Sequence, residues 1–559
     1  MKYLKLLPLS VLIVLTLQAQ SQQTFTQQDT LRGSEGTGRN WWDVQEYQLA
    51  VAVDIPTKSI KGSNRITFKV TKDGTPHKLQ IDMQMPMRID RIEYAQMKYG
   101  ALNFVREGNI CWVDFADREF KAGTEHTLVV HFSGTPRQAV RAPWDGGWVW
   151  AKDSLKRDWI TVACQGLGAS VWYPCKDFQG DEPDRGASLS ITVPDSLVAV
   201  GNGRLVRKQE NNNGSSTWHW KVTQPINNYN IIPYIGHYVN WEEKIAGAKG
   251  ELDASYWVLD YHLEKSKQHF GRDVKRMFAC FENWFGPYPF YEDSYKMIET
   301  PHLGMEHQSA VAYGNQYRDG YLGSDLSGSG WGTKWDYIII HETGHEWFAN
   351  NITTRDIADM WVHEGFTTYS EVLFVECEYG KKAADEYCRG LRENIENKET
   401  IIGPYGVNKE GSGDMYFKGA NLLHTIRQVI DNDSKFKQIL RGLNEKFYHS
   451  ITNTKEVESY FIQQSGKKLN KIFDQYLRDT RIPVLEYELA TRAGTTNSYQ
   501  LKYRWSQVVE GFDMPVKIWI NGKYVWIKPT EKMQTMTVNG KMPTEIKADP
   551  NFYINTQKN

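Results

Sequence analysis

The chain has 559 residues, which is more than one hydrophobic core normally organises, so roughly two to four domains are expected. Its composition, 40% hydrophobic and 24% charged, is ordinary for a globular protein. The formal net charge is -1, and no run of basic residues occurs. These features exclude nucleic acid as the main partner, because binding to it requires clustered Lys and Arg.

The N-terminus has the three-part layout of a secretory signal peptide. Two lysines precede an apolar run from Leu6 to Leu17, and small residues follow at Ala19 and Ser21. The run is shorter than the ~20 residues that a membrane-spanning helix needs. We therefore expect residues 1–21 to be removed, leaving an exported protein, periplasmic or secreted, without a membrane span.

From about Trp41 to His237 the chain alternates apolar and polar residues with a period of two, so residues 22–240 are predicted to form an N-terminal β domain. Turn-forming residues such as Asp73-Gly74 separate the runs. Many short alternating strands predict an antiparallel β-sandwich or a saddle-shaped sheet. The clearest apolar faces are Tyr47, Leu49, Val51 and Val53; Ile66, Phe68 and Val70; Leu79, Ile81 and Met83; and Leu189, Ile191 and Val193.

Near Leu263 the spacing of apolar residues changes to three and four, so residues 241–483 are predicted to form a mainly helical domain. Gly286-Pro287 ends its first helix. A Gly/Ser-rich stretch, 323–332, is predicted to be a mobile loop. The first apolar stripe is Phe270, Val274, Met277, Phe278, Phe281 and Phe285, and further helical patterns cover 337–350, 365–378, 416–430 and 469–477.

Alternation returns after Pro483, around the turn Asn521-Gly522. Residues 484–559 are therefore predicted to form a small C-terminal β-sandwich. The expected fold class is multidomain α+β, with β domains on either side of the helical one.

Six cysteines are too few for a disulfide scaffold at this length. In an exported protein, Cys164 with Cys175 or Cys377 with Cys388 are conceivable pairs. No two cysteines are separated by two residues, so a thiolate zinc site is not indicated. The connectivity cannot be read from the sequence.

Residues 341–345 read H-E-T-G-H within an apolar helical pattern. His341 and His345 are one helical turn apart, so both imidazoles can reach one metal ion. The intervening Glu342 is placed to act as a general base beside the metal. Glu364 lies nineteen positions after His345 and begins the next helical pattern. Two His and one Glu with a fourth position open are the ligands of a catalytic zinc, so one Zn2+ per chain is predicted.

With this spacing, the sequence resembles the aminopeptidase N family of gluzincin metallopeptidases, which has H-E-x-x-H, eighteen residues and Glu. The family phrase W-L-N-E-G-F reads W-V-H-E-G-F here, and H-Q-W-F-G-N reads H-E-W-F-A-N. The resemblance implies a thermolysin-like catalytic domain at 241–483 and cleavage of peptides by a zinc-activated water.

Selectivity for a free N-terminus requires a group that holds an ammonium ion. The family uses a G-x-M-E-N loop whose Glu binds the α-amine; here the chain reads Leu303-Gly304-Met305-Glu306-His307. The resemblance implies that Glu306 binds the amine and that Gly304 and Met305 line the substrate site. His307 replaces the usual Asn, and Leu303 stands where Gly is common.

Two further residues match family positions. Gln165 stands where the family has a second amine-contacting side chain, and Tyr416 matches the Tyr of the Y-x-K-G phrase that stabilises the oxyanion. Lys418, in the same phrase, is expected to make a structural ion pair. The flanking His302, His307 and His363 are not assigned as ligands.

Typical family members also have a large helical C-terminal domain, whereas only residues 484–559 follow Pro483 here and they read as strands. The chain therefore resembles a short form with a more open cleft, unless a partner subunit or the Gly/Ser-rich loop covers it. The predicted function is a zinc aminopeptidase acting on peptides with free N-termini. The main alternative is a zinc endopeptidase, and lipid-epoxide hydrolysis or a non-catalytic binding module are weaker ones. The sequence does not predict the oligomeric state or the preferred N-terminal residue.

Overall fold

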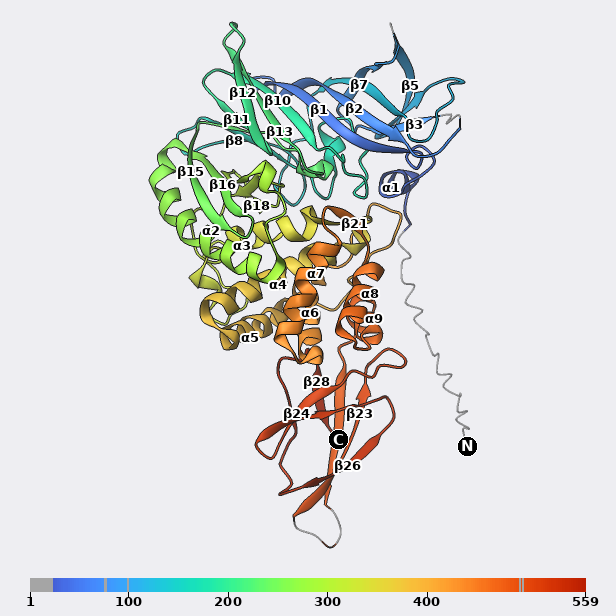
Figure 1. The fold of residues 1–559 in the computed structure, drawn as a ribbon, viewed down its shortest axis with the longest axis vertical. Coiled ribbons are helices and arrows are strands. Elements are labelled where there is room, and N and C mark those ends of the chain that lie inside the picture. The colour runs from blue at the N-terminus through green and yellow to red at the C-terminus, as the bar shows by residue number, and fades with distance from the viewer. Residues whose placement is uncertain (1–23, 75–77, 98–99, 492–493, 495–496) are drawn as a thin grey trace, which may run out of the picture.

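The computed structural model describes residues 24–559, apart from 75–77, 98–99, 492–493 and 495–496. The expected leader, 1–21, lies outside the described residues. Figure 1 shows three parts stacked along the long axis: a β-rich part, a helical part and a smaller β part at the opposite end. The predicted multidomain α+β fold class is confirmed.

The N-terminal part is built around a ten-stranded sheet of order β12-β13-β10-β1-β2-β7-β4-β5-β6-β3. The pairing is antiparallel except between β1 and β10, which run parallel. Alternation along β1 buries Tyr47, Leu49 and Val51 in the core, as the sequence predicted. The strands are β1 (Trp42–Asp54), β2 (Ser59–Val70), β3 (Leu79–Asp82), β4 (Arg88–Tyr94), β5 (Ala101–Glu107), β6 (Ile110–Asp114), β7 (Glu125–Gly134), β10 (Ala187–Pro194), β12 (Arg204–Glu210) and β13 (Ser215–Val222).

A second, four-stranded sheet of order β11-β14-β9-β8 belongs to the same hydrophobic core. The loop after its strand β9 carries Gln165, and a short 3-10 turn, Asn228–Asn230, precedes β14. The sheet therefore presents these two segments toward the helical part. Its strands are β8 (Gly147–Lys152), β9 (Asp158–Ala163), β11 (Val198–Val200) and β14 (Tyr234–Gly236).

The central part combines a five-stranded sheet, β15-β16-β17-β19-β18, with helices α2 to α9. Its sheet strands are β15 (Tyr238–Gly247), β16 (Gly250–Leu259), β17 (Tyr295–Glu299), β18 (Gly304–Met305) and β19 (Val311–Tyr313), and β20 (Ile352–Thr354) pairs with β21 (Ser450–Thr452). The helices are α2 (Leu263–Phe285), α3 (Tyr337–Gly344), α4 (Trp361–Tyr379), α5 (Lys381–Gly390), α6 (Phe417–Ile430), α7 (Asp433–Lys446), α8 (Thr454–Ser465) and α9 (Asn470–Arg478).

The predicted helices are confirmed with one difference. The pattern over 337–350 predicted a single helix, but α3 ends at Gly344 and the following turn departs from helical geometry at Phe348 and Ala349. Ala349 has φ 141°. The irregular turn directs the Phe348 carbonyl back to His345, which a continuous helix could not do. In the Gly/Ser-rich 323–332 stretch, the Asp325 carboxylate accepts hydrogen bonds from two main-chain N–H groups, those of Ser327 and Gly330.

Neither cysteine pair considered from the sequence forms. The structure joins Cys280 of α2 to Cys377 of α4, with a Cα–Cα distance of 6.0 Å, and Cys164, Cys175 and Cys388 remain free thiols. The pairing follows from packing of α2 against α4, two helices that are distant in sequence. Spacing along the chain carried no information on this contact.

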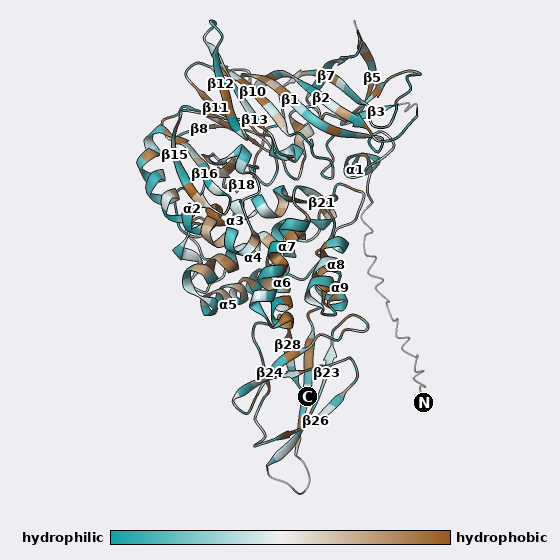
Figure 2. Ribbon diagram, viewed as in Figure 1, coloured by the Kyte–Doolittle hydropathy of each residue, from teal (hydrophilic) through white to brown (hydrophobic). Residues whose placement is uncertain are grey.

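The C-terminal part contains two small sheets, β26-β23-β22-β28 and β25-β24-β27. Apolar residues line its strands (Figure 2), and its core continues into that of the helical part. Within the described residues, no helix has the length and hydropathy required to cross a membrane. The strands are β22 (Val484–Thr491), β23 (Ser498–Ser506), β24 (Val516–Ile520), β25 (Lys523–Ile527), β26 (Gln534–Asn539), β27 (Lys547–Ala548) and β28 (Asn555–Lys558).

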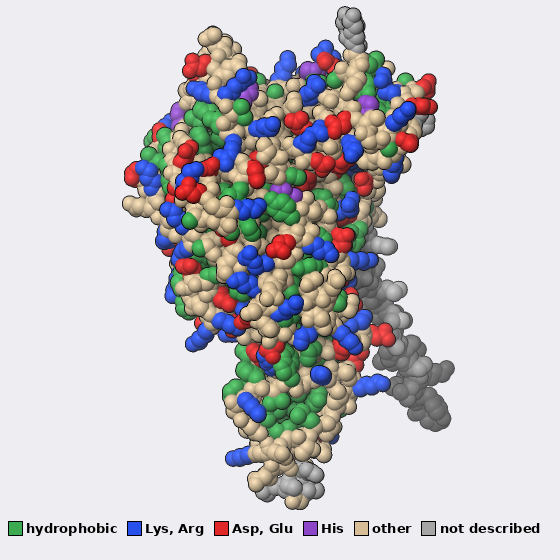
Figure 3. All heavy atoms as spheres, viewed as in Figure 1, with side chains coloured by type: hydrophobic (Ala, Val, Ile, Leu, Met, Phe, Trp, Pro, Cys, Tyr) green, Lys and Arg blue, Asp and Glu red, His purple; other side chains and the backbone are tan. Residues whose placement is uncertain are grey.

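Acidic and basic side chains are interspersed on the face seen in Figure 3, without a continuous basic area. This distribution agrees with the near-zero net charge.

Candidate metal centre and substrate site

Helix α3 begins at a well-defined cap. The Asp336 carboxylate accepts hydrogen bonds from the N–H groups of Ile338 and Ile339 and from the Tyr313 hydroxyl at 2.6 Å. The apolar residues that follow bury the helix completely. A buried, capped helix holds the H-E-T-G-H motif rigidly, which a metal centre requires.

Three donor groups converge at the end of α3 and the start of α4. Glu364 Oε2 lies 3.6 Å from His341 Nε2 and 3.3 Å from His345 Nε2. All three side chains are buried. Glu364 Oε2 has no hydrogen-bond partner among the described residues, which is costly for a buried carboxylate oxygen. Two imidazoles and a carboxylate facing one point fit a zinc ion, whose binding would compensate that cost.

The opposite nitrogen of each imidazole is already bonded. His341 Nδ1 lies 2.6 Å from Glu371 Oε1, and His345 Nδ1 lies 3.0 Å from the Phe348 carbonyl oxygen. These contacts fix the ring orientations and leave both Nε2 atoms facing Glu364. Outer partners of this kind are typical of histidines that bind metals.

The charges of the cluster reinforce one another. Burial alone would raise the pKa of Glu364, but His345 and His341 bring it well below its usual range. For His341, burial lowers the pKa, while the Glu364 and Glu371 carboxylates raise it well above its ordinary value. The site therefore stabilises a positive charge between these groups.

Glu342 points from α3 toward the same space. Burial raises the pKa of its carboxyl to about 7, a value suited to taking up and returning a proton near neutral pH. Gly304 of β18 makes room for it, because a Cβ at that position would lie 2.9 Å from Glu342 Oε1. Neighbouring Met305 is buried in the same short edge strand.

Glu306 lies in this cluster as well. Its carboxylate, that of Glu342 and a ring nitrogen of His345 are within 4.8 Å of one another. Glu306 Oε1 accepts hydrogen bonds from Gln165 Nε2 at 2.5 Å and from the Tyr229 hydroxyl at 2.7 Å. No hydrogen bond to Oε2 is formed within the described part of the chain, so that oxygen is available to a ligand.

The main chain around Glu306 is also held in place. Asn350 Nδ2 donates to the Glu306 carbonyl oxygen at 2.8 Å, and Asn230 Nδ2 donates to Asn350 Oδ1 at 2.7 Å. Both asparagines are buried. The N-terminal part thus supports the Glu306 loop both directly, through Gln165 and Tyr229, and indirectly, through Asn230.

Tyr416 immediately precedes α6, and its ring centroid lies 6.1 Å from that of His341. Its hydroxyl makes no hydrogen bond within the described ranges, so it is free to bind a ligand. Close packing of two glycines permits this placement, since a Cβ on Gly365 of α4 would lie 3.2 Å from the Gly419 Cα. Lys418 does not form the expected ion pair; its Nζ donates to the Asp479 main-chain carbonyl at 2.9 Å instead.

The histidines left unassigned from the sequence are engaged elsewhere. His363 Nε2 accepts a hydrogen bond from the Thr354 N–H at 2.9 Å, and His307 Nδ1 lies 2.5 Å from the Tyr234 hydroxyl. Burial lowers the pKa of His302 to about 4, so its ring is neutral. None of them joins the three-residue donor cluster.

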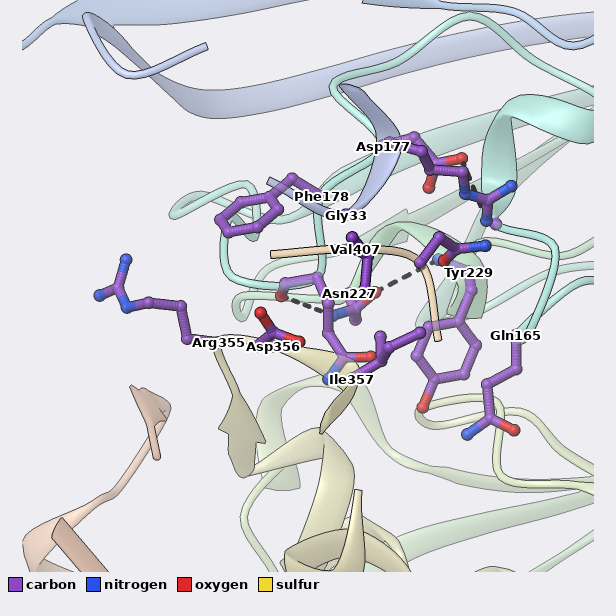
Figure 4. A pocket seen from close by; sticks show the side chains of 14 residues that line it. Gly33, Gln165, Asp177, Phe178, Asn227, Tyr229, Arg355, Asp356, Ile357 and Val407 are labelled. Carbon is purple, nitrogen blue, oxygen red and sulfur yellow. Dashed lines mark hydrogen bonds and ion pairs between the residues drawn. The ribbon is translucent and has the colours of Figure 1, made fainter. Parts of the chain in front are cut away.

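A small pocket of about 40 Å³ is lined by the two side chains that donate to Glu306. Gln165 and Tyr229 form one wall of it, and Asp177, Phe178 and Asn227 from the N-terminal part form another (Figure 4). The rest of the lining comes mainly from helix α1 (Gln27–Gly33), from residues 355–357 and from the loop at Val407 and Asn408. Residues 323–332 do not contribute to its lining.

Sequence reasoning missed several of these residues: Tyr229, Asn350, Asn230 and Glu371. Glu371 lies seven positions after Glu364 on α4, so helical periodicity could have indicated it. Tyr229 and Asn230 belong to a segment without a recognisable motif. Only the fold shows that they reach the site.

Two family models match the chain. The "Peptidase M1 N-terminal domain" model covers residues 44–229, and the "Peptidase family M1 domain" model covers 272–476, which includes all three metal-donor residues. The chain therefore belongs to peptidase family M1.

Two aminopeptidases are similar to this chain over much of its length. Endoplasmic reticulum aminopeptidase 1 of Homo sapiens is 22% identical over 475 residues, which are 80% of this chain and 48% of that protein. Aminopeptidase B of Mus musculus is 23% identical over 346 residues, which are 58% and 50% of the two chains. The chain spans about half the length of these relatives.

Solved structures share the fold. The M1 zinc metallopeptidase from Deinococcus radiodurans has a TM-score of 0.65 and 19% identity, covering 79% of this chain and 94% of its own. A mutant of that protein bound to a Tyr-Ser-Ala substrate has a TM-score of 0.66, also at 19% identity, covering 79% and 95%.

Proposed function

We propose that this protein is a zinc-dependent aminopeptidase that releases the N-terminal residue of peptides. The observation that carries the proposal is the position of Glu306, whose carboxylate lies in one cluster with Glu342 and His345. A buried carboxylate beside the metal donors holds an ammonium group through a charge-assisted hydrogen bond. It thereby places the first peptide bond, and no other, at the metal centre.

Each residue of the site has a role in this proposal. His341, His345 and Glu364 hold the metal, and Glu371 fixes the orientation of His341. Bound there, zinc would supply Lewis-acid chemistry, polarising a carbonyl and lowering the pKa of a water toward ~7.

The proton transfers are assigned to Glu342, whose carboxylate takes a proton from the attacking water and returns it to the leaving amine. The free Tyr416 hydroxyl donates a hydrogen bond to the carbonyl oxygen as negative charge develops there. Gln165 and Tyr229 keep Glu306 facing the substrate amine, and Gly304 and Met305 form the strand beside which the peptide lies.

The two relatives described above are aminopeptidases, which supports this function. No observation favours an endopeptidase, because in that case the buried Glu306 carboxylate would have no substrate ammonium group to bind.

The domain limits that we propose are 22–240, 241–483 and 484–559. Export is proposed from the leader at 1–21, and the disulfide between α2 and α4 supports it, because disulfides persist in oxidising compartments.

The test compares aminoacyl-anilides and peptides with free N-termini with matched N-acetylated peptides, with and without a zinc chelator. We expect chelator-sensitive cleavage of free N-termini only. Glu306→Ala should lower kcat/KM for these substrates by ~10²-fold or more, since it removes a charged contact to the reacting substrate. Chelator-sensitive cleavage of acetylated peptides that is unaffected by Glu306→Ala would instead establish an endopeptidase.

A further inference from the structure

The pocket beside Glu306 contains an arginine that has no strong partner of its own. Arg32 Nη2 lies 3.9 Å from Asp177 Oδ2, and its guanidinium makes no hydrogen bond in the described portion of the chain. The Asp177 oxygen is already bonded to the Ser170 N–H at 3.1 Å and to the Ser170 hydroxyl at 2.5 Å. The Arg32 side chain is only 17% exposed. Five N–H donors in such a setting are available to an anionic ligand.

The main chain around Arg32 is, by contrast, firmly fixed. Arg39 Nη1 donates to the Arg32 carbonyl oxygen at 2.8 Å, and Gln80 Nε2 donates to the Leu31 carbonyl oxygen at 3.0 Å. Both donors belong to the N-terminal part of the fold. These bonds position the residue while leaving its guanidinium free.

Helix α1, which carries Arg32, also contacts the helical part of the fold. The Asn408 N–H donates to the Asp29 carbonyl oxygen at 3.1 Å. Gly33 approaches the Val407 main chain so closely that a Cβ on it would lie 2.0 Å from the Val407 carbonyl carbon. In Figure 1, α1 lies between the N-terminal sheets and the helices. The helix therefore closes one side of the pocket and carries Arg32 into its lining.

The pocket adjoins the position at which the proposed function places the substrate amine, because it shares two side chains with the surroundings of Glu306. This side chain and the α-amine are attached to the same carbon atom, so a substrate amine on Glu306 directs the side chain into adjacent space. Gln165 and Tyr229, the two donors to Glu306, line the pocket themselves. In Figure 4 both point toward the same side of it, while Arg355 extends away from them.

Resting on the proposed aminopeptidase function, we infer that Arg32 is a specificity-determining residue that selects substrates whose N-terminal side chain is acidic. A Glu or Asp carboxylate entering the pocket would form the hydrogen-bonded ion pair that Asp177, at 3.9 Å, does not provide. A Lys or Arg side chain would be repelled by the same guanidinium. A purely aliphatic side chain would desolvate Arg32 without compensating it.

The experiment measures kcat/KM for Glu-, Gln-, Leu- and Lys-anilides with the full chain. Anilides lack a C-terminal carboxylate, so a preference for Glu over Gln reports the first side chain alone. We expect wild type to prefer the Glu-anilide by about tenfold, and Arg32→Gln to remove most of that ratio. Arg32→Glu should reverse the order in favour of the Lys-anilide.

Arg65→Gln is the matched control. Arg65 is exposed on β2, and its side chain makes no ion pair or hydrogen bond within the described sequence, so the Glu/Gln ratio should stay at the wild-type value. Thermal unfolding of each variant checks that it folds. A wild-type ratio at or below one, or a ratio that folded Arg32→Gln leaves unchanged, would overturn the inference. Absence of chelator-sensitive release from every anilide would instead refute the proposed function itself.

Discussion

The proposed metal donors and the proposed amine anchor are two halves of one candidate site, and they are assembled differently. The donors His341, His345 and Glu364 come from two helices that follow one another in the chain and pack together. The anchor, Glu306, depends on side chains from the loop after β9, from the turn before β14 and from the end of the irregular turn after α3. The metal half is formed by neighbouring segments of the chain, whereas the amine half forms only where two domains meet.

This difference has an energetic consequence. The metal half is formed by helices that share a single hydrophobic core, so its geometry does not depend on how the N-terminal part sits against the helical part. The amine half relies on hydrogen bonds across a domain boundary, and small displacements of the N-terminal part would move the donors to Glu306. Substrate positioning should therefore be easier to damage than metal binding.

The largest effect is expected on the metal side, for Glu342→Gln. The amide cannot accept a proton, so kcat should fall by about 10³-fold, with KM for peptides with free N-termini little changed. Steady-state kinetics together with zinc analysis of the purified variant measure this. Normal zinc content with lost turnover would assign Glu342 to proton transfer; a loss of activity smaller than about tenfold would contradict that role.

A smaller and different effect is expected on the amine side, for Tyr229→Phe. Loss of one of two donors leaves Glu306 less well oriented, so KM should rise by about tenfold while kcat changes less. Tyr94→Phe is the matched control, because it removes a buried hydroxyl that contacts His126 far from the site. Equal changes in the two variants, or a fall in thermal stability without a change in KM, would show that Tyr229 is only structural.

The smallest effect concerns the boundary between the two parts, where the Thr353 hydroxyl donates to Glu182 Oε1 at 2.6 Å. Burial raises the pKa of Glu182 from its ordinary value of 4.5 to about 8. The folded protein therefore holds a proton that the unfolded chain releases between these values. Stability contributed by this proton is fully present below the unfolded pKa and is lost as the pH rises through the folded one.

Glu182→Gln imitates the protonated acid at every pH. Relative to this variant, wild type should lose several degrees of melting temperature between pH 5 and pH 9. Thermal unfolding of both proteins across that range measures the difference. Parallel melting curves would show that Glu182 does not link the domain boundary to pH.

Much of the fold was predictable because its strands and helices have local sequence patterns. Alternation along β1 and the apolar stripe of α2 follow from the fixed geometry of strands and helices. The prediction failed at 337–350, where apolar residues continue but the backbone breaks at Phe348 and Ala349. This turn brings the Phe348 carbonyl oxygen to His345 Nδ1, and hydrophobic periodicity does not report such a contact.

The disulfide and the environment of Lys418 were also beyond sequence reasoning. Cys280 and Cys377 are 97 positions apart, and only the packing of α2 on α4 brings them together. Lys418 has the motif context expected of an ion pair, yet the nearest acceptor is a main-chain carbonyl. Local sequence cannot tell which acceptor a distant segment will bring.

The sequence by itself determined which residues to propose as metal donors, because the helical period places His341 and His345 on one face and the following helix supplies Glu364. It also indicated Glu306 and Tyr416 through short motifs. Only the tertiary structure decided what surrounds them: Tyr229 and Gln165 on Glu306, and Arg32 of α1 in the adjoining pocket. Backbone geometry repeats along a chain and can be read from it, whereas contacts between domains depend on how whole surfaces pack.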